Sequence, residues 1–181
     1  WIVIVMIRMT NTNEWYIFNG GAIDKKTCDR IKRWASKKWE TSTVSIDQGD
    51  LTNDERKTGR KGDYKLDSKS RISDIAWCNE QWLYDIVWEF MKRANQESGW
   101  RFDIKSCESC QVTRYKKGGF YGFHNDGAGD HLSAYDIPDN HFLDGRVRKL
   151  SMSIILNDNF EGGAFEFATY NKEKCTVVPI K

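Results

Sequence analysis

The chain has few prolines, little net charge and no long apolar run, and each of these features excludes a class of protein. Two prolines and 14 glycines in 181 residues argue against global disorder. A net charge of +2 gives no strong field that would attract nucleic acid or a membrane surface. The opening run, WIVIVMI, is too short to cross a bilayer. We therefore expect no membrane association and regard nucleic acid as an improbable partner.

The same opening run does not look like a signal peptide. No basic segment precedes it, and no small-residue cleavage site follows it. It is expected to form a strand or, if translation starts at Met6 or Met9, to lie before the natural start. The oligomeric state is not indicated by the sequence.

The five cysteines do not form a disulfide framework, because their number is odd and their spacing is irregular. Cys107 and Cys110 make a single CxxC pair. A structural zinc site would need two more ligands at suitable spacing, and none lies near this pair. Free thiols in a reducing compartment are expected, which favours a cytoplasmic protein.

Length and composition predict one globular domain covering residues 1–181. Hydrophobic residues make up 39% of the chain and charged residues 30%, as in ordinary soluble domains. Eight Trp, seven Tyr and nine Phe supply ample material for a core. No internal repeat or low-complexity tract divides the chain.

Two amphipathic helices are predicted in the first hundred residues. AIDKKTCDRIKRWASKKW has an N-cap candidate in Asp24, followed by apolar residues at helical spacing. NEQWLYDIVWEFMKRANQ carries a longer apolar stripe that should cover one face of a sheet. The apolar positions are Cys28, Ile31, Trp34 and Ala35 in the first helix, and Trp82, Leu83, Ile86, Val87, Phe90, Met91 and Ala94 in the second.

The rest of the chain predicts a long loop and then a series of strands. Residues 41–70 are polar and should form a long surface loop, which is either functional or merely mobile. After Trp100 the segments SCQVTRY, KLSMSIIL, GAFEF and CTVV have strand character and are separated by turns. Helices first and strands later favour an α+β domain with helices packed on an antiparallel sheet.

One short segment, RYKKGGFYGFHND at positions 114–126, indicates chemistry. His124 and Asp126 are two residues apart, so on extended backbone they share a face and can hold one divalent ion. Two histidines and a carboxylate form the facial triad of non-haem Fe(II) oxygenases. A His-x-Asp pair alone is weak evidence, because most such pairs lie in surface turns.

The context strengthens this interpretation. Tyr115 and Tyr121 precede the histidine, and Gly118 and Gly119 suit a tight turn between two strands. The pattern is Y-x-x-G-G-x-Y-x-x-H-x-D, and IILNDNFEGGAFEF follows downstream. Together with CDRI and SRISDIAW, these motifs resemble the prolyl-4-hydroxylase-like 2-oxoglutarate/Fe(II) dioxygenases, especially the PKHD-type hydroxylases of bacteria and phages. The resemblance runs from about Phe18 to the end of the chain.

The resemblance implies a double-stranded β-helix, or jelly-roll, core with the N-terminal helices packed on its sheet. It implies Fe(II) as metal, 2-oxoglutarate as cosubstrate and ascorbate as an accessory reductant. The expected reaction hydroxylates a prolyl, another peptidyl or a small-molecule substrate with O2 and releases succinate and CO2. His124 and Asp126 would be iron ligands, and Tyr115 would lie near the 2-oxoglutarate pocket.

The strand RKLSMSIIL would line the same pocket. Alternation puts Ser151, Ser153 and Ile155 on one face, with Met152 and Ile154 towards the helices. In the family the serine face lines the cosubstrate pocket. Some relatives carry a tyrosine at the position of Ile155 that bonds the distal carboxylate, so here that contact must come from elsewhere.

The chain also departs from the family pattern. The second iron-binding histidine, and a following Arg or Lys that grips 2-oxoglutarate, are expected after the Gly-Gly hairpin, but neither occurs before CTVVPIK ends the chain. His131 and His141 are weak substitutes. The expectation is a C-terminally truncated domain that lacks its last core strands, so that the chain as given turns over little.

Two other functions stay open at this point. Nucleic-acid dealkylating dioxygenases share the skeleton around His-x-Asp, but they have an Asn and an aliphatic residue where this chain has Arg114 and Tyr121. A non-catalytic jelly-roll binding module would need no complete metal site. Tyr121 is expected to be a packing residue, and Arg71 is expected to be solvated.

Overall fold

The computed structural model describes residues 3–7, 15–18, 20–42, 44–45, 64–65, 68–124, 134–168 and 175–178. The elements are, in chain order, β1 (Val3–Ile7), β2 (Trp15–Phe18), α1 (Lys25–Ala35), β3 (Glu40–Thr41), β4 (Val44–Ser45), β5 (Tyr64–Lys65), β6 (Arg71–Ile72), β7 (Asp74–Cys78), α3 (Gln81–Glu97), β8 (Cys110–Arg114), β9 (Phe120–Tyr121), β10 (Leu150–Ile154), β11 (Phe165–Ala168) and β12 (Cys175–Val178).

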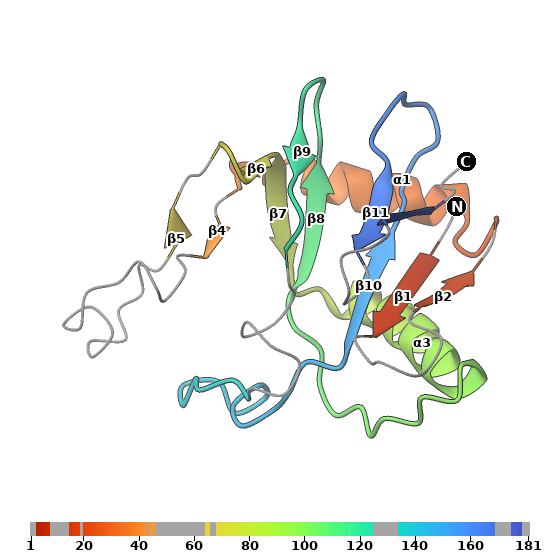
Figure 1. Ribbon diagram of the computed structural model, residues 1–181, viewed down its shortest axis with the longest axis vertical. Helices are drawn as coiled ribbons and strands as arrows, with labels where there is room; N and C mark the ends of the chain where they lie inside the picture. The colour runs from red at the N-terminus through yellow and green to blue at the C-terminus, as the bar shows by residue number, and fades with distance from the viewer. Residues whose placement is uncertain are drawn as a thin grey trace.

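These elements form a mixed α+β fold, as predicted, in which the described strands pair antiparallel (Figure 1). One sheet has the order β10-β1-β2 and another has the order β3-β7-β8. The pairs β6-β9, β11-β12 and β4-β5 complete the sheets of the described residues. None of the described helices is both long and apolar enough to span a membrane.

Helix α1 begins where the sequence predicts. Asp24 is the N-cap, and its carboxylate accepts a hydrogen bond from the backbone N–H of Thr27 at 2.6 Å. Cys28, Ile31 and Ala35 are buried along one face. The apolar spacing therefore describes the face that α1 turns to the sheets.

Helix α3 supplies the second half of the helical layer. Leu83, Val87, Phe90 and Ala94 are buried, in agreement with the predicted stripe. The core of the described residues consists of two clusters, and apolar residues of and after β10 pack against both of them. Strand β10 thus joins the two halves of the core. The residues that do so are Met152, Ile154 and Leu156.

The order "helices first, strands later" is wrong in detail. Strands β1, β2, β6 and β7 all precede Trp100, and β7 is the middle strand of its sheet. The opening apolar run does form a strand, and it pairs with β10 in the register Val3↔Ile154 to Ile7↔Leu150. Neither the pairing nor the position of β7 follows from a local pattern, because both depend on segments far apart in the chain.

The predicted loop at 41–70 also contains regular structure. Its described part includes β4 and β5, which pair with the register Val44↔Lys65 and Ser45↔Tyr64. Thr41 belongs to β3, which pairs with β7. A few residues of moderate strand propensity within this polar segment therefore suffice to form short antiparallel strand pairs.

Strands β6 and β7 pair with β9 and β8 to form a two-stranded ribbon that folds over on itself, and this folded ribbon positions the site. Strand β8 pairs with β7, and β9, which follows β8, pairs with β6, which precedes β7. A turn joins β8 to β9: the N–H of Gly119 donates to the carbonyl of Lys116 at 2.8 Å, and Gly118 has φ of 79°. That φ is the one that a type II turn requires at its third residue, which explains the glycine. The predicted turn is thus present, but the strands it joins pair with β7 and β6 instead of with each other.

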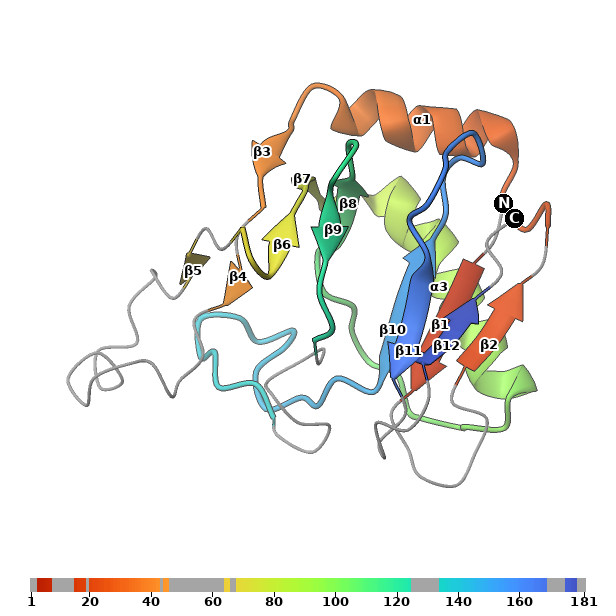
Figure 2. The same cartoon turned by 45° about the horizontal axis from the view of Figure 1, so that its top comes forward.

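The ribbon bends at Ser73 and at residues 115–119, so that β6 and β9 lie in front of β7 and β8 (Figure 2). Helix α3 lies behind β10 and β1 in the same view, and α1 runs across the top, above the strands. Side chains on the front of β8 therefore face β6 and β9, and those on its back face the helices.

Candidate functional site

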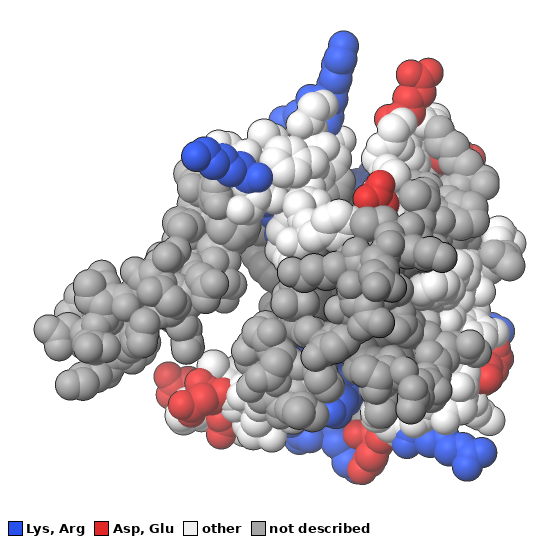
Figure 3. Space-filling view, viewed as in Figure 1, with Lys and Arg blue, Asp and Glu red and all other residues white. Residues whose placement is uncertain are grey.

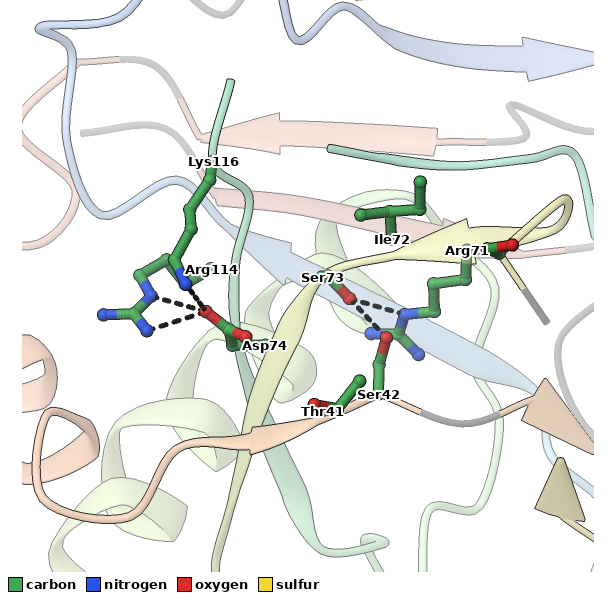
Figure 4. Close-up of a pocket in the computed structure, with 9 residues that line it drawn as sticks. Thr41, Ser42, Arg71, Ile72, Ser73, Asp74, Arg114 and Lys116 are labelled. Carbon is green, nitrogen blue, oxygen red and sulfur yellow. Dashed lines mark hydrogen bonds and ion pairs between the residues drawn. The ribbon is translucent and has the colours of Figure 1, made fainter. Parts of the chain in front are cut away.

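A buried arginine lies inside the fold of the ribbon. Arg71 is only 8% exposed, so the expectation of a solvated side chain is wrong. Its Nε–H donates to Ser73 Oγ at 2.9 Å (Figure 4), and its Nη2 donates to Gln111 Oε1 at 2.6 Å and to Thr113 Oγ1 at 3.4 Å. Arg71 avoids solvent because acceptors from β8 take the place of water.

These hydrogen bonds require the bend in the ribbon. In the ladder Gln111 is opposite Trp77, six positions along the strand from Arg71. A straight strand would separate them by roughly 20 Å, since each residue advances about 3.3 Å. A direct hydrogen bond is possible only because β6 folds back over β8. Val112 between the two acceptors is buried on the helix side, so Gln111 and Thr113 face the front.

Arg71 is linked to His124 through the ring of Tyr121. The guanidinium carbon lies 4.3 Å from the Tyr121 ring centroid, a cation–π contact. Tyr121 and His124 are stacked, with centroids 3.7 Å apart and planes inclined by 15°. Tyr121 is therefore not a simple core residue: it holds the imidazole in one orientation.

The hydrogen bond of His124 defines which nitrogen could bind a metal. Nδ1 lies 2.8 Å from the carbonyl oxygen of Gly122. A carbonyl can only accept, so Nδ1 must carry the proton, and in the neutral ring the lone pair is on Nε2. Metal-ligating histidines commonly have this arrangement, with the second nitrogen donating to a carbonyl. The imidazole of His124 thus has the orientation and tautomer of a ligand that binds through Nε2.

Tyr115, predicted for the cosubstrate pocket, follows β8 directly and lies near Arg71. Burial raises the pKa of the Tyr115 hydroxyl, although 48% of the residue is exposed, and the positive charge of Arg71 opposes that rise. Tyr115 continues the alternation of Gln111 and Thr113 along the front of the strand. The prediction that Tyr115 and His124 belong to one region is compatible with this placement, and Arg71 lies near both.

Ser151 and Ser153 are partly buried on β10. Because Met152 and Ile154 pack against the helix-side clusters, the two serines face the opposite side of the strand, as the alternation predicts. Within the part of the chain that the structure describes, no hydrogen bond joins these serines to Arg71 or Tyr115. Their role as a pocket wall stays a prediction.

The rest of the predicted metal site is not described. Asp126 and His131 lie outside the described residues. His141 is exposed in a loop, next to Phe142 with ring centroids 6.1 Å apart. Among the described residues, no three side chains of His, Cys, Asp or Glu are grouped to hold a metal ion.

A pocket of about 380 Å³ opens at the corner of the ribbon. One part of its wall carries the Arg71 and Ser73 side chains, and another carries Asp74 with two cations (Figure 4). Asp74 Oδ2 accepts from Arg114 Nη2 at 2.7 Å and from Lys116 Nζ at 3.0 Å, which lowers the pKa of its carboxyl. The lining residues are Thr41, Ser42, Ser68, Arg71, Ile72, Ser73, Asp74, Arg114 and Lys116.

Sequence reasoning missed this polar group, although a signal was present. Arg71 and Ser73 are separated by one residue, so their side chains share a face if the segment is extended. The same spacing holds along the later segment for Gln111, Thr113 and Tyr115. Alternating polar residues opposite a buried valine would have indicated a polar interior face.

The four cysteines whose side chains are described lie apart from this site. Cys28, Cys78, Cys107 and Cys110 carry free thiols, as expected. A hydrogen bond between Cys107 and Cys110 lowers the pKa of Cys107 and raises that of Cys110. The pair is half-buried behind β8, on the side of the helices.

Comparison of the chain with protein-family models, with curated proteins and with solved structures finds no match. What the chain does must therefore be inferred from its residues and their geometry.

Proposed function

We propose that this protein is a 2-oxoglutarate- and Fe(II)-dependent hydroxylase. Its substrate would be a prolyl residue, another peptidyl side chain or a small molecule. The observation that carries the proposal is the state of His124, whose ring is stacked on Tyr121 and whose Nδ1 donates to a backbone carbonyl. In the neutral form of such an imidazole the lone pair is on Nε2, the nitrogen through which it would bind a metal.

His124 fits the role of an iron ligand, and Asp126 would supply the carboxylate two residues later. Imidazole and carboxylate are the ligands of the facial triad that binds Fe(II) in non-haem oxygenases. Bound iron would supply the activation of O2, with 2-oxoglutarate oxidised to succinate and CO2 as the substrate gains a hydroxyl group. Ascorbate would keep the metal reduced.

The chain itself would contribute orientation and a dry pocket. Tyr121 and the Gly122 carbonyl hold the imidazole, and Arg71 in turn holds Tyr121. Tyr115, Ser151 and Ser153 would offer hydroxyl groups to the cosubstrate from the face of the sheets that is turned away from the helices. The folding of β6 and β9 over β7 and β8 supports a jelly-roll core, in which such a face lines an interior pocket. The free thiols support a reducing, cytoplasmic location.

Metal binding tests the proposal most directly. Residues 1–181 are titrated anaerobically with Fe(II), and with Mn(II) as an air-stable substitute, and binding is compared with that of His124→Ala and Asp126→Ala. Loss of a direct ligand should weaken binding by more than the roughly 10–100-fold typical of residues that only support ligands. His141→Ala is the matched control, because this histidine is exposed in a separate loop.

Turnover gives the second readout. Succinate release is measured with Fe(II), 2-oxoglutarate and ascorbate for the same four proteins. Any activity should be lost in His124→Ala and kept in His141→Ala. Equal metal binding by His124→Ala and the parent protein would refute the iron assignment. Loss of binding in the His141→Ala control would instead make that histidine the ligand.

A further inference from the structure

The hydrogen bonds of Arg71 to Ser73, Gln111 and Thr113 do not use its Nη1 nitrogen. A guanidinium has five N–H donors. Nε uses its one on Ser73, and Nη2 uses its two on Gln111 and Thr113. The Tyr115 hydroxyl also interacts with the guanidinium. Beyond that contact Nη1 donates no hydrogen bond to a described residue, and no carboxylate of the described residues lies within ion-pair distance of Arg71. A buried cation therefore borders the pocket with donor capacity left on Nη1.

Burial of such a charge is costly unless something compensates it. An ionised side chain that leaves water needs hydrogen bonds and, as a rule, an opposite charge. The three neutral acceptors and the Tyr121 ring offset part of this cost. The missing contribution is a negative charge at Nη1.

A second donor comes from a short hydroxyl chain beside the guanidinium. Ser73 accepts from Arg71 Nε and donates to Ser42 Oγ at 3.0 Å. Ser42 accepts this bond, so its own proton is directed elsewhere. Ser42 is 4% exposed and lines the same pocket (Figure 4). The Ser42 O–H and the Nη1 N–H groups are thus two donors in one wall of the pocket.

The charges around the pocket favour a singly charged ligand. Arg114 and Lys116 are both bound to Asp74, so Arg71 is the cation without an acidic partner among the described lining residues. The Nη1 group of one cation together with one hydroxyl suits a carboxylate, whereas a doubly charged phosphate would need a second cation. Figure 3 shows basic side chains at the tip of the β8–β9 turn and over β6, which would attract an anion to this corner.

We propose that this pocket is a carboxylate-binding site, with Arg71 Nη1 and the Ser42 hydroxyl as its donors. The carboxylate has two possible sources. It belongs either to 2-oxoglutarate, in which case the inference rests on the proposed hydroxylase function, or to an acidic group of a separate substrate. In the first case Arg71 would supply the contact to the distal carboxylate that Ile155 cannot make. The Tyr121 ring, which contacts both Arg71 and His124, would then connect this contact with the proposed iron ligand.

Acetate is the probe for the site itself, because it carries the carboxylate and nothing else. The ¹⁵N-labelled chain, without added metal, is titrated with sodium acetate at constant ionic strength, and the Nε–Hε signal of Arg71 is followed by NMR. Acetate should shift this signal saturably. Affinity should fall about tenfold or more in Arg71→Gln, since a hydrogen bond to a charged group is lost. Lys117→Gln, a neighbouring cation that does not line the pocket, should bind like the parent chain.

Two outcomes overturn the site: an Arg71 signal that acetate does not shift, or an unchanged affinity in Arg71→Gln. If Arg71→Gln does not fold, Ser42→Ala takes its place. That variant keeps the guanidinium and should bind acetate several-fold more weakly, and an unchanged affinity would equally overturn the proposal.

A 2-oxoglutarate titration with Mn(II) then identifies the source. If Arg71→Gln weakens 2-oxoglutarate binding together with acetate binding, the carboxylate belongs to the cosubstrate. If only acetate binding falls, it belongs to a substrate. The acetate titration contains no metal and does not involve His124, so a failure of the proposed hydroxylase would leave its result unaffected.

Discussion

Ser73→Ala should be among the most damaging single-atom changes at the bend of the ribbon. The substitution removes the oxygen that accepts from the Arg71 Nε–H and donates to Ser42, and all three residues are buried. A hydrogen bond to a charged group contributes about 1.5–3 kcal/mol, and a neutral one about 0.5–1.5 kcal/mol. No water replaces the lost acceptor easily, because Ser73 is only 8% exposed. The free energy of unfolding should fall by about 2–4 kcal/mol.

Thr113→Val provides the matched control. Thr113 accepts from Nη2 at 3.4 Å, while Gln111 accepts from the same nitrogen at 2.6 Å, so the loss of the longer bond should cost less than about 1 kcal/mol. Urea unfolding followed by tryptophan fluorescence measures both variants. Thermal unfolding should shift by roughly 2–4 °C for each kcal/mol in a chain of this size. Ser73→Thr, which keeps the hydroxyl, should recover most of the loss.

A result within about 0.5 kcal/mol of the parent chain for Ser73→Ala would refute this account of the buried cation. Equal losses in Ser73→Ala and Thr113→Val would also refute it. In that case the shorter bond to Ser73 would stabilise Arg71 no more than the longer bond to Thr113 does.

Two further perturbations test other parts of the structure. Gly119→Ala would place a Cβ atom 2.9 Å from two backbone carbonyl oxygens. It should therefore lower the free energy of unfolding, measured in urea, by roughly 1–3 kcal/mol. An unchanged stability would mean that the β8–β9 turn has a different conformation. On helix α1, hydrogen bonds from Lys25 and Lys32 lower the pKa of Asp29 to about 2, below the unfolded value of about 4. Asp29 therefore stabilises the fold above pH 4, and this contribution is lost as the pH falls towards 2. Asp29→Asn should be less stable than the parent chain at neutral pH and equal to it near pH 2, and an ordinary pKa for Asp29 by NMR would contradict the ion pairs.

The helices could be predicted from the sequence because their signals are local. Asp24 caps the first turn of α1 through its own neighbour, and the spacing of Leu83, Val87 and Phe90 needs only the helical repeat. The same holds for the turn at Gly118, whose φ is a property of one residue. The strand β8 and the alternation along β10 were predictable for the same reason.

Strand β7 and the burial of Arg71 could not be predicted in this way. The buried positions of β7 include Ala76 and Cys78, small residues that give no strong apolar alternation, and its place between β3 and β8 depends on distant segments. The sequence around Arg71 predicts an exposed side chain, because a charged group loses its hydration when it is buried. Its acceptors Gln111 and Thr113 come from a strand some forty residues later, and only the folded ribbon brings them near.

The pairing of β1 with β10 also constrains how the chain reaches its fold during synthesis. Val3 is opposite Ile154, so the first strand leaves the ribosome about 150 residues before its partner. At 5–20 residues per second the delay is roughly 8–30 s. During that time β2 can pair with one edge of β1, but the other edge, in an apolar segment of high strand propensity, stays open to other chains. Chaperone demand during translation should therefore fall sharply once synthesis has passed β10, and a shortened nascent chain that ends before Leu150 should aggregate where one that includes β10 does not.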